Sequence, residues 1–227
     1  MDDELHDSWR SVISEHLAPA AVHRLLGIFA PAIRQQYPQL EDEFGDLSDW
    51  SIGQRYVDDP ESCVLLADVQ ISYHAPVPNT TAQDRGPHLK MTNKLLICQL
   101  LMRLFEDDSE GGELQLYTRP DKEKLLVVTG DQEVVAGQGL ILEKTIPYRA
   151  NTAVAFLNTP ESIQTMAPRR SDKPLMYLNM IFEHRRPLFS LKNVTDRQVE
   201  KPPQSGLGHE KPTILSFINR IISGGSD

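Results

Sequence analysis

From residue 62 onward the chain is a succession of short apolar runs separated by turn-forming residues. The runs are CVLLADVQISYHAPV, LLICQLLMRLF, GELQLYTR, KLLVVTG, QGLILEKTIPY, TAVAFLN and LMYLNMIFEH, and they are bounded by PVPNT, DDSEGG, RPDKE, GDQE and RRSDKP. Short apolar runs with partial alternation of apolar and polar residues are typical of β-strands. A series of such strands predicts a β-sandwich or a jelly-roll barrel.

The N-terminal part of the chain has a helical pattern instead. Over residues 3–36, apolar residues recur at spacings of three and four, as they do on one face of a helix. Pro19 interrupts this pattern, which predicts two helices that meet there. Residues 37–60 are acidic and rich in turn formers, so we expect a loop with one short helical turn around 41–45. The predicted fold is mainly β with helices (α+β), and the N-terminal helices pack on one sheet.

The length of 227 residues fits one domain with terminal extensions. We expect residues 1–60 to form a helical and loop segment integral to the domain, and residues 61–191 to form the β core. Residues 192–227 are predicted to be a linker followed by a short C-terminal helix. The linker is polar and contains Pro and Gly, whereas TILSFINRII, after it, has an amphipathic helical pattern.

Composition excludes several classes of function. The net charge of -9 and the pI near 5.3 argue against broad binding to nucleic acid or anionic membranes. No apolar run approaches the ~20 residues of a membrane span, and the acidic N-terminus lacks the apolar region of a secretory signal. Cys63 and Cys98 lie in apolar runs, so we expect buried free thiols. These features predict a cytoplasmic protein without membrane insertion.

The stretch GPHLKMTNK, residues 86–94, is close to the pattern of a metal site. A His followed two residues later by an Asp or Glu on a strand places two metal ligands on the same face, because side chains alternate along a strand. With a distant second His, this pair makes the facial triad of non-haem Fe(II) oxygenases. Here the pair is His88 and Lys90, and an ammonium group cannot bind iron.

Four further segments follow this stretch in a recognisable order: DDSEGGEL (107–114), YRANTAVAFLN (148–158), PESIQ (160–164) and APRR (167–170). Together with GPHLKMTNK they resemble the double-stranded β-helix (jelly-roll, cupin-like) core of the Fe(II)- and 2-oxoglutarate-dependent oxygenases. The resemblance is to the prolyl-4-hydroxylase-like bacterial branch and covers about residues 62–184. It implies this fold for the β core.

Several residues of these segments have roles in the scaffold that do not require iron. Gly111 and Gly112 follow an acidic turn and can adopt positive φ values, which brings two strands round. Asn151 can satisfy backbone groups at the entry of a strand. Val154 and Phe156 alternate with alanines, as in a strand with one face in the core. The scaffold of the family is therefore retained.

The resemblance also implies positions for the metal and the cosubstrate, and most of them carry other residues. The first metal-binding His corresponds to His88, the carboxylate to Lys90 and the distal His to Gln164. The basic residue that holds 2-oxoglutarate corresponds to Lys173 or, with a short gap, to Leu175; neither is the expected Arg. The tyrosine of the family's cosubstrate site corresponds to Leu101. The expected degenerate ligand site is therefore His88, Lys90, Gln164, Lys173 and Leu101, with Leu175 as the alternative to Lys173.

Electrostatics argue against iron at this position. An ammonium a few ångströms from a dication costs on the order of several kcal/mol at an effective dielectric constant near 20. Two alternatives remain for Lys90. In the first, its stem lies along the barrel and its ammonium reaches solvent at the mouth. In the second, the ammonium occupies the metal position and gives a metal-free site for a carboxylate or phosphate ligand. His88 is the one candidate catalytic residue, as a general base in a non-oxidative reaction.

Other basic residues are weaker candidates. Arg169 and Arg170 lie near the expected mouth of the site and are possible contacts for an anion. EHRRP places His184, Arg185 and Arg186 at the end of the last strand, where a solvated edge is the simpler interpretation. His74 precedes the first motif and is a possible neighbour of the site.

The predicted function is that of a pseudoenzyme with a 2-oxoglutarate-oxygenase-like fold, acting as a metal-free binding or scaffolding component in biosynthesis. The expected partners are a small anionic ligand, a partner protein or a second copy of the chain, the latter two through the N-terminal and C-terminal helices; no nucleic acid and no cofactor are expected. Two alternatives stay open. One is a metal-independent enzyme that uses His88 and Lys90, and the other is a divergent hydroxylase that uses Fe(II) and 2-oxoglutarate.

Overall fold

The structure is a computed structural model of the 227-residue chain. It describes residues 7–74, 86–119, 126–129, 133–136, 139–169, 171–190 and 194–196. Residue Arg170, the expected C-terminal helix and most of the expected linker lie outside the described residues.

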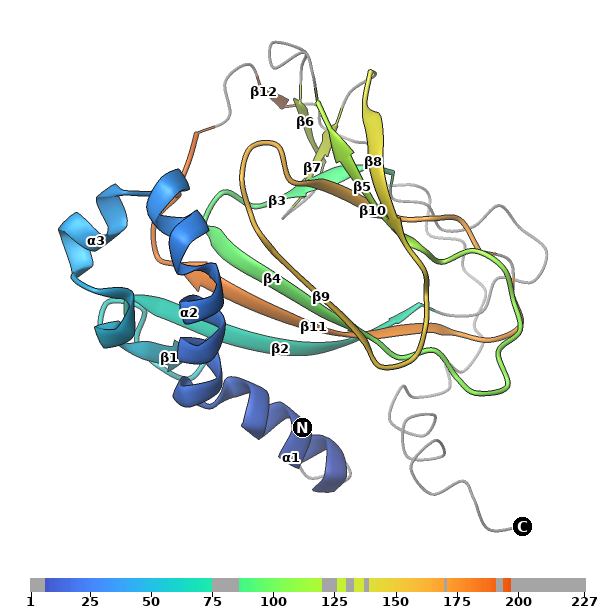
Figure 1. Ribbon diagram of the computed structural model, residues 1–227, viewed down its shortest axis with the longest axis horizontal. Coiled ribbons are helices and arrows are strands. Elements are labelled where there is room, and N and C mark those ends of the chain that lie inside the picture. The colour runs from blue at the N-terminus through green and yellow to red at the C-terminus, as the bar shows by residue number, and fades with distance from the viewer. Residues whose placement is uncertain are drawn as a thin grey trace.

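Helices form the N-terminal part of the described chain, as the apolar spacing predicts (Figure 1). They are α1 (Asp7–Leu17), α2 (Pro19–Gln36), α3 (Gln39–Phe44) and the 3-10 turn η2 (Leu47–Asp49). Pro19 is the first residue of α2, a position where proline's missing N–H costs no hydrogen bond. The predicted break between two helices at Pro19 and the short helical turn near 41–45 are both confirmed.

Strands make up most of the remainder. They are β1 (Ile52–Gln54), β2 (Leu65–His74), β3 (His88–Lys90), β4 (Lys94–Leu101), β5 (Leu114–Thr118), β6 (Leu126–Thr129), β7 (Glu133–Ala136), β8 (Ile141–Ile146), β9 (Thr152–Leu157), β10 (Ile163–Met166), β11 (Leu175–His184) and β12 (Val194–Asp196). Each predicted apolar run contains a strand. The pattern missed β1, β7 and β10, which are three or four residues long, and β12, which lies in the expected linker.

The described strands form two sheets (Figure 1). The first, which we name the helix-covered sheet, has the order β1-β2-β11-β4-β9. The second sheet has the order β12-β6-β7-β3-β10-β5-β8. Pairing is antiparallel except for β1 with β2 and β12 with β6. The structure is thus a mixed α+β architecture dominated by two sheets.

One face of the helix-covered sheet packs against the helices, as predicted. The core there joins Val22, Leu26 and Ile33 of α2 to alternate residues of the central strands, which are Leu96, Cys98, Leu178, Met180 and Phe182. Because side chains alternate along a strand, the residues between these lie on the opposite face. We name this opposite side the inner face; it carries Ile97, Gln99 and Leu101 of β4 and Tyr177, Asn179 and Ile181 of β11.

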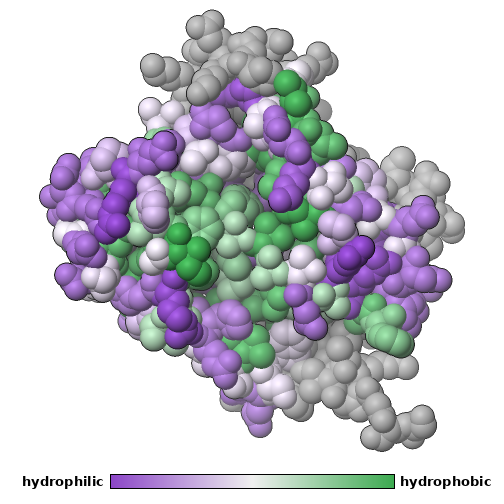
Figure 2. Space-filling model, in the orientation of Figure 1, coloured by the Kyte–Doolittle hydropathy of each residue, from purple (hydrophilic) through white to green (hydrophobic). Residues whose placement is uncertain are grey.

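The molecular surface reflects this division (Figure 2). Hydrophilic residues dominate the region of the helices, and apolar or weakly polar residues gather toward the centre of the visible face. Among the described residues no single helix is long and apolar enough to cross a membrane, although α1 and α2 together, bent by 49°, meet that test by length and composition.

A buried tyrosine ties the helices to the sheet. Tyr37, which ends α2, donates a hydrogen bond of 2.6 Å from its hydroxyl to the carbonyl oxygen of Asn158, just beyond β9. The Asn158 side chain in turn donates to the carbonyl oxygens of Met91 and Lys94, at the start of β4. Burial raises the pKa of Tyr37, with a smaller contribution from Glu161, so the hydroxyl remains a donor at neutral pH.

The Tyr37→Phe variant tests this connection. It leaves the buried carbonyl oxygen of Asn158 without its donor, which costs ~1–3 kcal/mol. We expect chemical denaturation to show a loss of that size in the free energy of unfolding. Tyr56→Phe is the matched control, because Tyr56 is 81% exposed, and it should leave stability unchanged. Equal stability of the two variants would contradict this role for Tyr37.

Candidate functional site

The structure brings three of the expected site residues onto one surface. In the antiparallel pair of β3 and β10, His88 lies directly opposite Gln164. Lys90 follows His88 by two residues in the same strand, so all three side chains lie on the same face of the second sheet. Their exposed fractions are 8% for His88, 9% for Lys90 and 2% for Gln164. The three side chains therefore lie together on one buried surface.

This cluster faces the other sheet. Met166 lies two residues after Gln164 in β10 and hence on the same face. Its side chain packs against a cluster of Leu101, Leu175 and Tyr148. Leu101 belongs to the inner face of the helix-covered sheet, so the strand face that carries Gln164 is turned toward that sheet. Leu101 and Leu175, two of the expected positions, thus lie on the wall opposite His88, Lys90 and Gln164.

Lys173, the alternative to Leu175, lies elsewhere. It is in the segment before β11, with a side chain that is 36% exposed and an ammonium 3.9 Å from Asp172. Its carbonyl oxygen accepts a hydrogen bond from Arg169. Leu175 begins β11 and is buried. Of the two candidates, the structure places Leu175 on the inner face and Lys173 at a partly exposed turn.

Two buried amides occupy the opposite wall, and the sequence interpretation missed both. Gln99 of β4 and Asn179 of β11 are direct partners in the antiparallel ladder. They are 3% and 7% exposed. The available signal was a polar residue in the middle of each apolar run, LLICQLLM and LMYLNMIF. Such a residue in a strand that is buried on both faces requires a hydrogen-bond partner.

A charged group lies further along the same inner face. Arg55 contacts the Asp68 carboxylate at 3.4 Å and the Glu183 carboxylate at 3.0 Å. Asp68 and Glu183 follow the inner-face alternation of β2 and β11. Burial raises the pKa of Glu183, while the charges of Arg55 and Lys94 oppose that shift. The inner face is thus polar along much of its length, unlike the apolar face against the helices.

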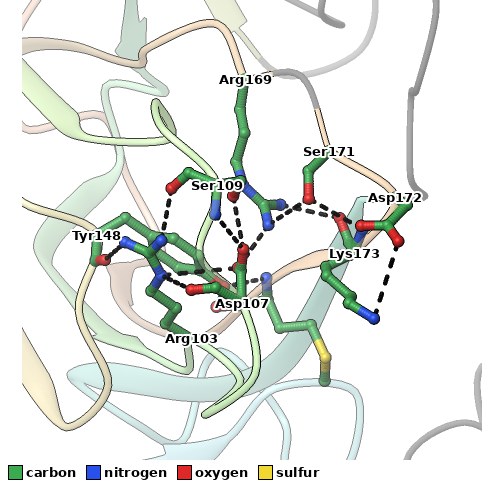
Figure 3. Close-up of polar contacts among 9 residues, drawn as sticks. Arg103, Asp107, Ser109, Tyr148, Arg169, Ser171, Asp172 and Lys173 are labelled. Carbon is green, nitrogen blue, oxygen red and sulfur yellow. Dashed lines mark hydrogen bonds and ion pairs between the residues drawn. The ribbon is translucent and has the colours of Figure 1, made fainter.

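Two arginines, Arg103 and Arg169, form a hydrogen-bond network around Asp107 (Figure 3). The Asp107 side chain has no exposed area and accepts hydrogen bonds from Arg169 and from the hydroxyl and backbone N–H of Ser109. Arg103 donates to the carbonyl oxygens of Asp107, Ser109 and Tyr148. Both guanidinium groups lie near the Tyr148 ring, Arg103 at 5.9 Å and Arg169 at 5.5 Å from its centroid.

The glycine turn after Asp107 fits this network closely. Gly111 and Gly112 have φ values of 91° and 79°, as the sequence predicted for the turn. A Cβ atom on Gly111 would lie 2.3 Å from the carbonyl oxygen of Pro168. The turn therefore packs directly against the segment that carries Arg169.

Arg169 was expected as an anion contact, and the structure shows it in a structural role. Its guanidinium donates to the Asp107 carboxylate, the Ser109 and Ser171 hydroxyls and the Lys173 carbonyl oxygen. These contacts join the turn at 107–112 to the segment before β11. No observation on the described residues links Arg169 to a ligand, and Arg170 lies outside them.

The other basic candidates are engaged as well. Arg185 forms an ion pair of 2.8 Å with Glu61, and Arg186 forms one of 2.9 Å with Glu43. His184 is buried, and that burial lowers its pKa. The His74 ring stacks on Tyr177 with 5.8 Å between ring centroids. His74 therefore lies beside the inner face, whereas Arg185 and Arg186 form ion pairs at the end of β11.

The donor set around His88 does not fit Fe(II). One imidazole, an ammonium and a carboxamide share this face, and an ammonium offers no lone pair to a metal. Within the part of the chain that the structure describes, no group of three His, Cys, Asp or Glu side chains is arranged to hold a metal ion. The arrangement instead places a cation and two hydrogen-bonding side chains on one buried surface.

Comparison with known proteins gives a distant similarity in structure. No protein-family model matches the chain, and no curated protein matches it. Among solved structures, it is similar to the crystal structure of a prolyl-4-hydroxylase from Pseudomonas putida, with a TM-score of 0.31 and 12% sequence identity. The similarity covers 52% of this chain and 53% of that chain, about half of each. It assigns no residue a role.

The Asp107→Asn variant tests the arginine network. Hydrogen bonds from Ser109 and Arg169 lower the pKa of Asp107 against the opposing effect of burial. Removing one partner of a buried ion pair costs ~3–5 kcal/mol, and we expect a loss of that size at pH 7. A lowered pKa stabilises the fold above the unfolded value of ~3.9, and this contribution disappears as the pH falls through the folded value.

The free energy of unfolding, measured from pH 7 to pH 2, checks both expectations. The difference between wild type and Asp107→Asn should shrink below about pH 4, as the carboxyl group of the wild type takes up its proton. Asp108→Asn is the matched control, because Asp108 is an exposed neighbour, and it should behave like the wild type. A pH-independent difference, or an equal loss in both variants, would contradict the role given to Asp107.

Proposed function

We propose that this chain is a catalytically degenerate 2-oxoglutarate-oxygenase-like protein that binds a small anion, without a metal, between its two sheets. In this proposal the two sheets are the walls of a double-stranded β-helix. The observation that carries the proposal is the shared face of His88, Lys90 and Gln164, set by the pairing of β3 with β10. The resemblance of the sequence places the metal triad at these three positions.

The charge of Lys90 is what separates this site from a metal site. A dication and an ammonium about 4 Å apart repel each other by ~8 kcal/mol at an effective dielectric constant of 20, twice the value for two unit charges. Gln164 contributes a neutral carbonyl oxygen, a weak substitute for imidazole as a ligand of iron. The same ammonium group that repels a metal ion attracts an anion.

The size of the ligand follows from the architecture. Facing sheets pack about 10 Å apart and their own side chains fill most of that distance, so we propose a ligand of a few carbon atoms rather than a polymer. The ammonium of Lys90 favours a carboxylate or phosphate group. We propose that binding of such a ligand, with or without a partner protein at the N-terminal helices, is the activity of the chain.

A second function has support from one hydrogen bond. The Nδ1 atom of His88 lies 3.0 Å from the carbonyl oxygen of Gly86. A carbonyl oxygen only accepts, so this contact requires a proton on Nδ1 and makes Nε2 the basic nitrogen of the neutral ring. A general base on the second sheet is the arrangement that a metal-independent enzyme would need. Turnover that disappears in a folded His88→Ala variant would favour this alternative.

Titration with Mn(II) and 2-oxoglutarate tests the absence of metal chemistry. We expect no calorimetric binding of Mn(II) by the wild type, and no thermal stabilisation by millimolar Mn(II) beyond that given by 2-oxoglutarate alone as a carboxylate ligand. The double variant Lys90→Asp, Gln164→His restores a carboxylate and an imidazole beside His88, and we expect it to bind Mn(II) at least tenfold more tightly than the wild type. Tight Mn(II) binding by the wild type, or succinate formation with Fe(II) and 2-oxoglutarate, would sink the proposal.

Replacement of Lys90 tests anion binding directly. We expect gluconate, glutarate or inorganic phosphate to raise the melting temperature of the wild type, and Lys90→Met to abolish that shift. Lys173→Met is the matched control, because that lysine is partly exposed at a turn, and it should retain the shift. If none of the three anions binds, or if Lys90→Met responds like the wild type, the anion site is refuted.

A further inference from the structure

We infer that the amide pair Gln99 and Asn179 is a recognition site for hydroxyl groups, so that the ligand between the sheets is a small hydroxylated carboxylate. This inference rests on the proposed function, since it assigns the carboxylate to Lys90 on the facing sheet. It adds a role for the two carboxamides on the inner face of the helix-covered sheet, which the sequence did not predict.

The geometry of the pair is set by the backbone. Gln99 and Asn179 are opposite one another in the β4–β11 ladder, so both side chains emerge side by side on the inner face. Their neighbours two residues along the two strands are Ile97 and Leu101 beside Gln99, and Tyr177 and Ile181 beside Asn179. Two carboxamides thus lie side by side on the inner face, with apolar side chains beside Gln99 and with Tyr177 and Gln70 beside Asn179.

Both amides have an unsatisfied acceptor. The side-chain oxygens Oε1 of Gln99 and Oδ1 of Asn179 are buried and have no hydrogen-bond partner among the described residues. The same is true of Oε1 of Gln164 on the facing sheet. Each buried acceptor without a partner costs ~1–3 kcal/mol. Leucine at either strand position would avoid that cost, so the pair is destabilising unless something else supplies donors.

A ligand that satisfies these amide oxygens must donate hydrogen bonds. A hydroxyl group donates to the carbonyl oxygen of a carboxamide and also accepts from its NH₂ group, so it satisfies both ends of a Gln or Asn side chain. The carboxylate of a simple fatty acid offers no donors to this wall. A carboxylate with hydroxyl groups along its carbon chain satisfies Lys90 at one end and the amides along its length.

Calorimetric titration of the full chain with three six-carbon probes tests the inference. The probes are gluconate, which has a carboxylate and hydroxyl groups, hexanoate, which has only the carboxylate, and sorbitol, which has only hydroxyl groups. We expect the wild type to bind gluconate at least tenfold more tightly than either other probe. The variant Gln99→Leu, Asn179→Leu should lose at least tenfold in gluconate affinity and be unchanged toward hexanoate.

Stability distinguishes recognition from a structural role. Because leucines remove two unsatisfied acceptors, we expect the double variant to melt at or above the temperature of the wild type. Gln36→Leu at the exposed end of α2 is the matched control and should bind gluconate normally. If the double variant is folded and binds gluconate as the wild type does, the inference is overturned.

Different results would overturn the anion site at Lys90 and the amide site at Gln99 and Asn179. Equal binding of gluconate and hexanoate, both dependent on Lys90, would overturn the amide site and leave the anion site intact. Binding of no carboxylate by the wild type, with an unchanged response in Lys90→Met, would overturn the proposed function and the inference together. Tight binding of sorbitol alone would retain the amide site and remove the role of Lys90.

Discussion

The pairing of β10 with its two neighbours is the constraint on which the candidate site depends. β10 has four residues, yet it joins β3 on one side and β5 on the other. Its register places Gln164 opposite His88 and turns Met166 toward the helix-covered sheet. A slip of one residue would reverse every side chain of the strand and separate Gln164 from His88.

The two central strands of the helix-covered sheet have one apolar face and one face with buried polar groups. One face of β4 and β11 contributes apolar side chains to the core with α2, and burial of such side chains contributes ~1.5–3 kcal/mol each. The inner face of the same strands carries amides and charges that a stable core does not need. The helix-covered face and the Asp107 network can hold the fold while the inner face varies.

Much of the fold was predictable from the sequence, and the reasons for the exceptions are physical. Apolar spacing over 3–36 and the proline at position 19 gave both long helices, because these signals are local. β10 was missed because IQTM has neither the length nor the alternation of a strand. β12 was missed because VTD lies in a polar segment, and its partner β6 is far away in the sequence.

The candidate site was predictable only in part. The cluster of His88, Lys90 and Gln164 came from a family resemblance, since nothing in the local sequence links residue 164 to residue 88. The partner of Arg169 is Asp107, 62 positions away, and no pattern in the sequence announces that ion pair. Gln99 and Asn179 were visible as polar residues in apolar runs, but only the ladder register shows that they are neighbours.

One measurement tests the central claim most directly: a crystal structure of the chain grown with gluconate and Mn(II), with anomalous diffraction data for manganese. The account predicts gluconate between the sheets, its carboxylate at the Lys90 ammonium and its hydroxyl groups at Gln99 and Asn179, and no anomalous peak at His88. A manganese peak bound by His88, with Lys90 turned away, would contradict it.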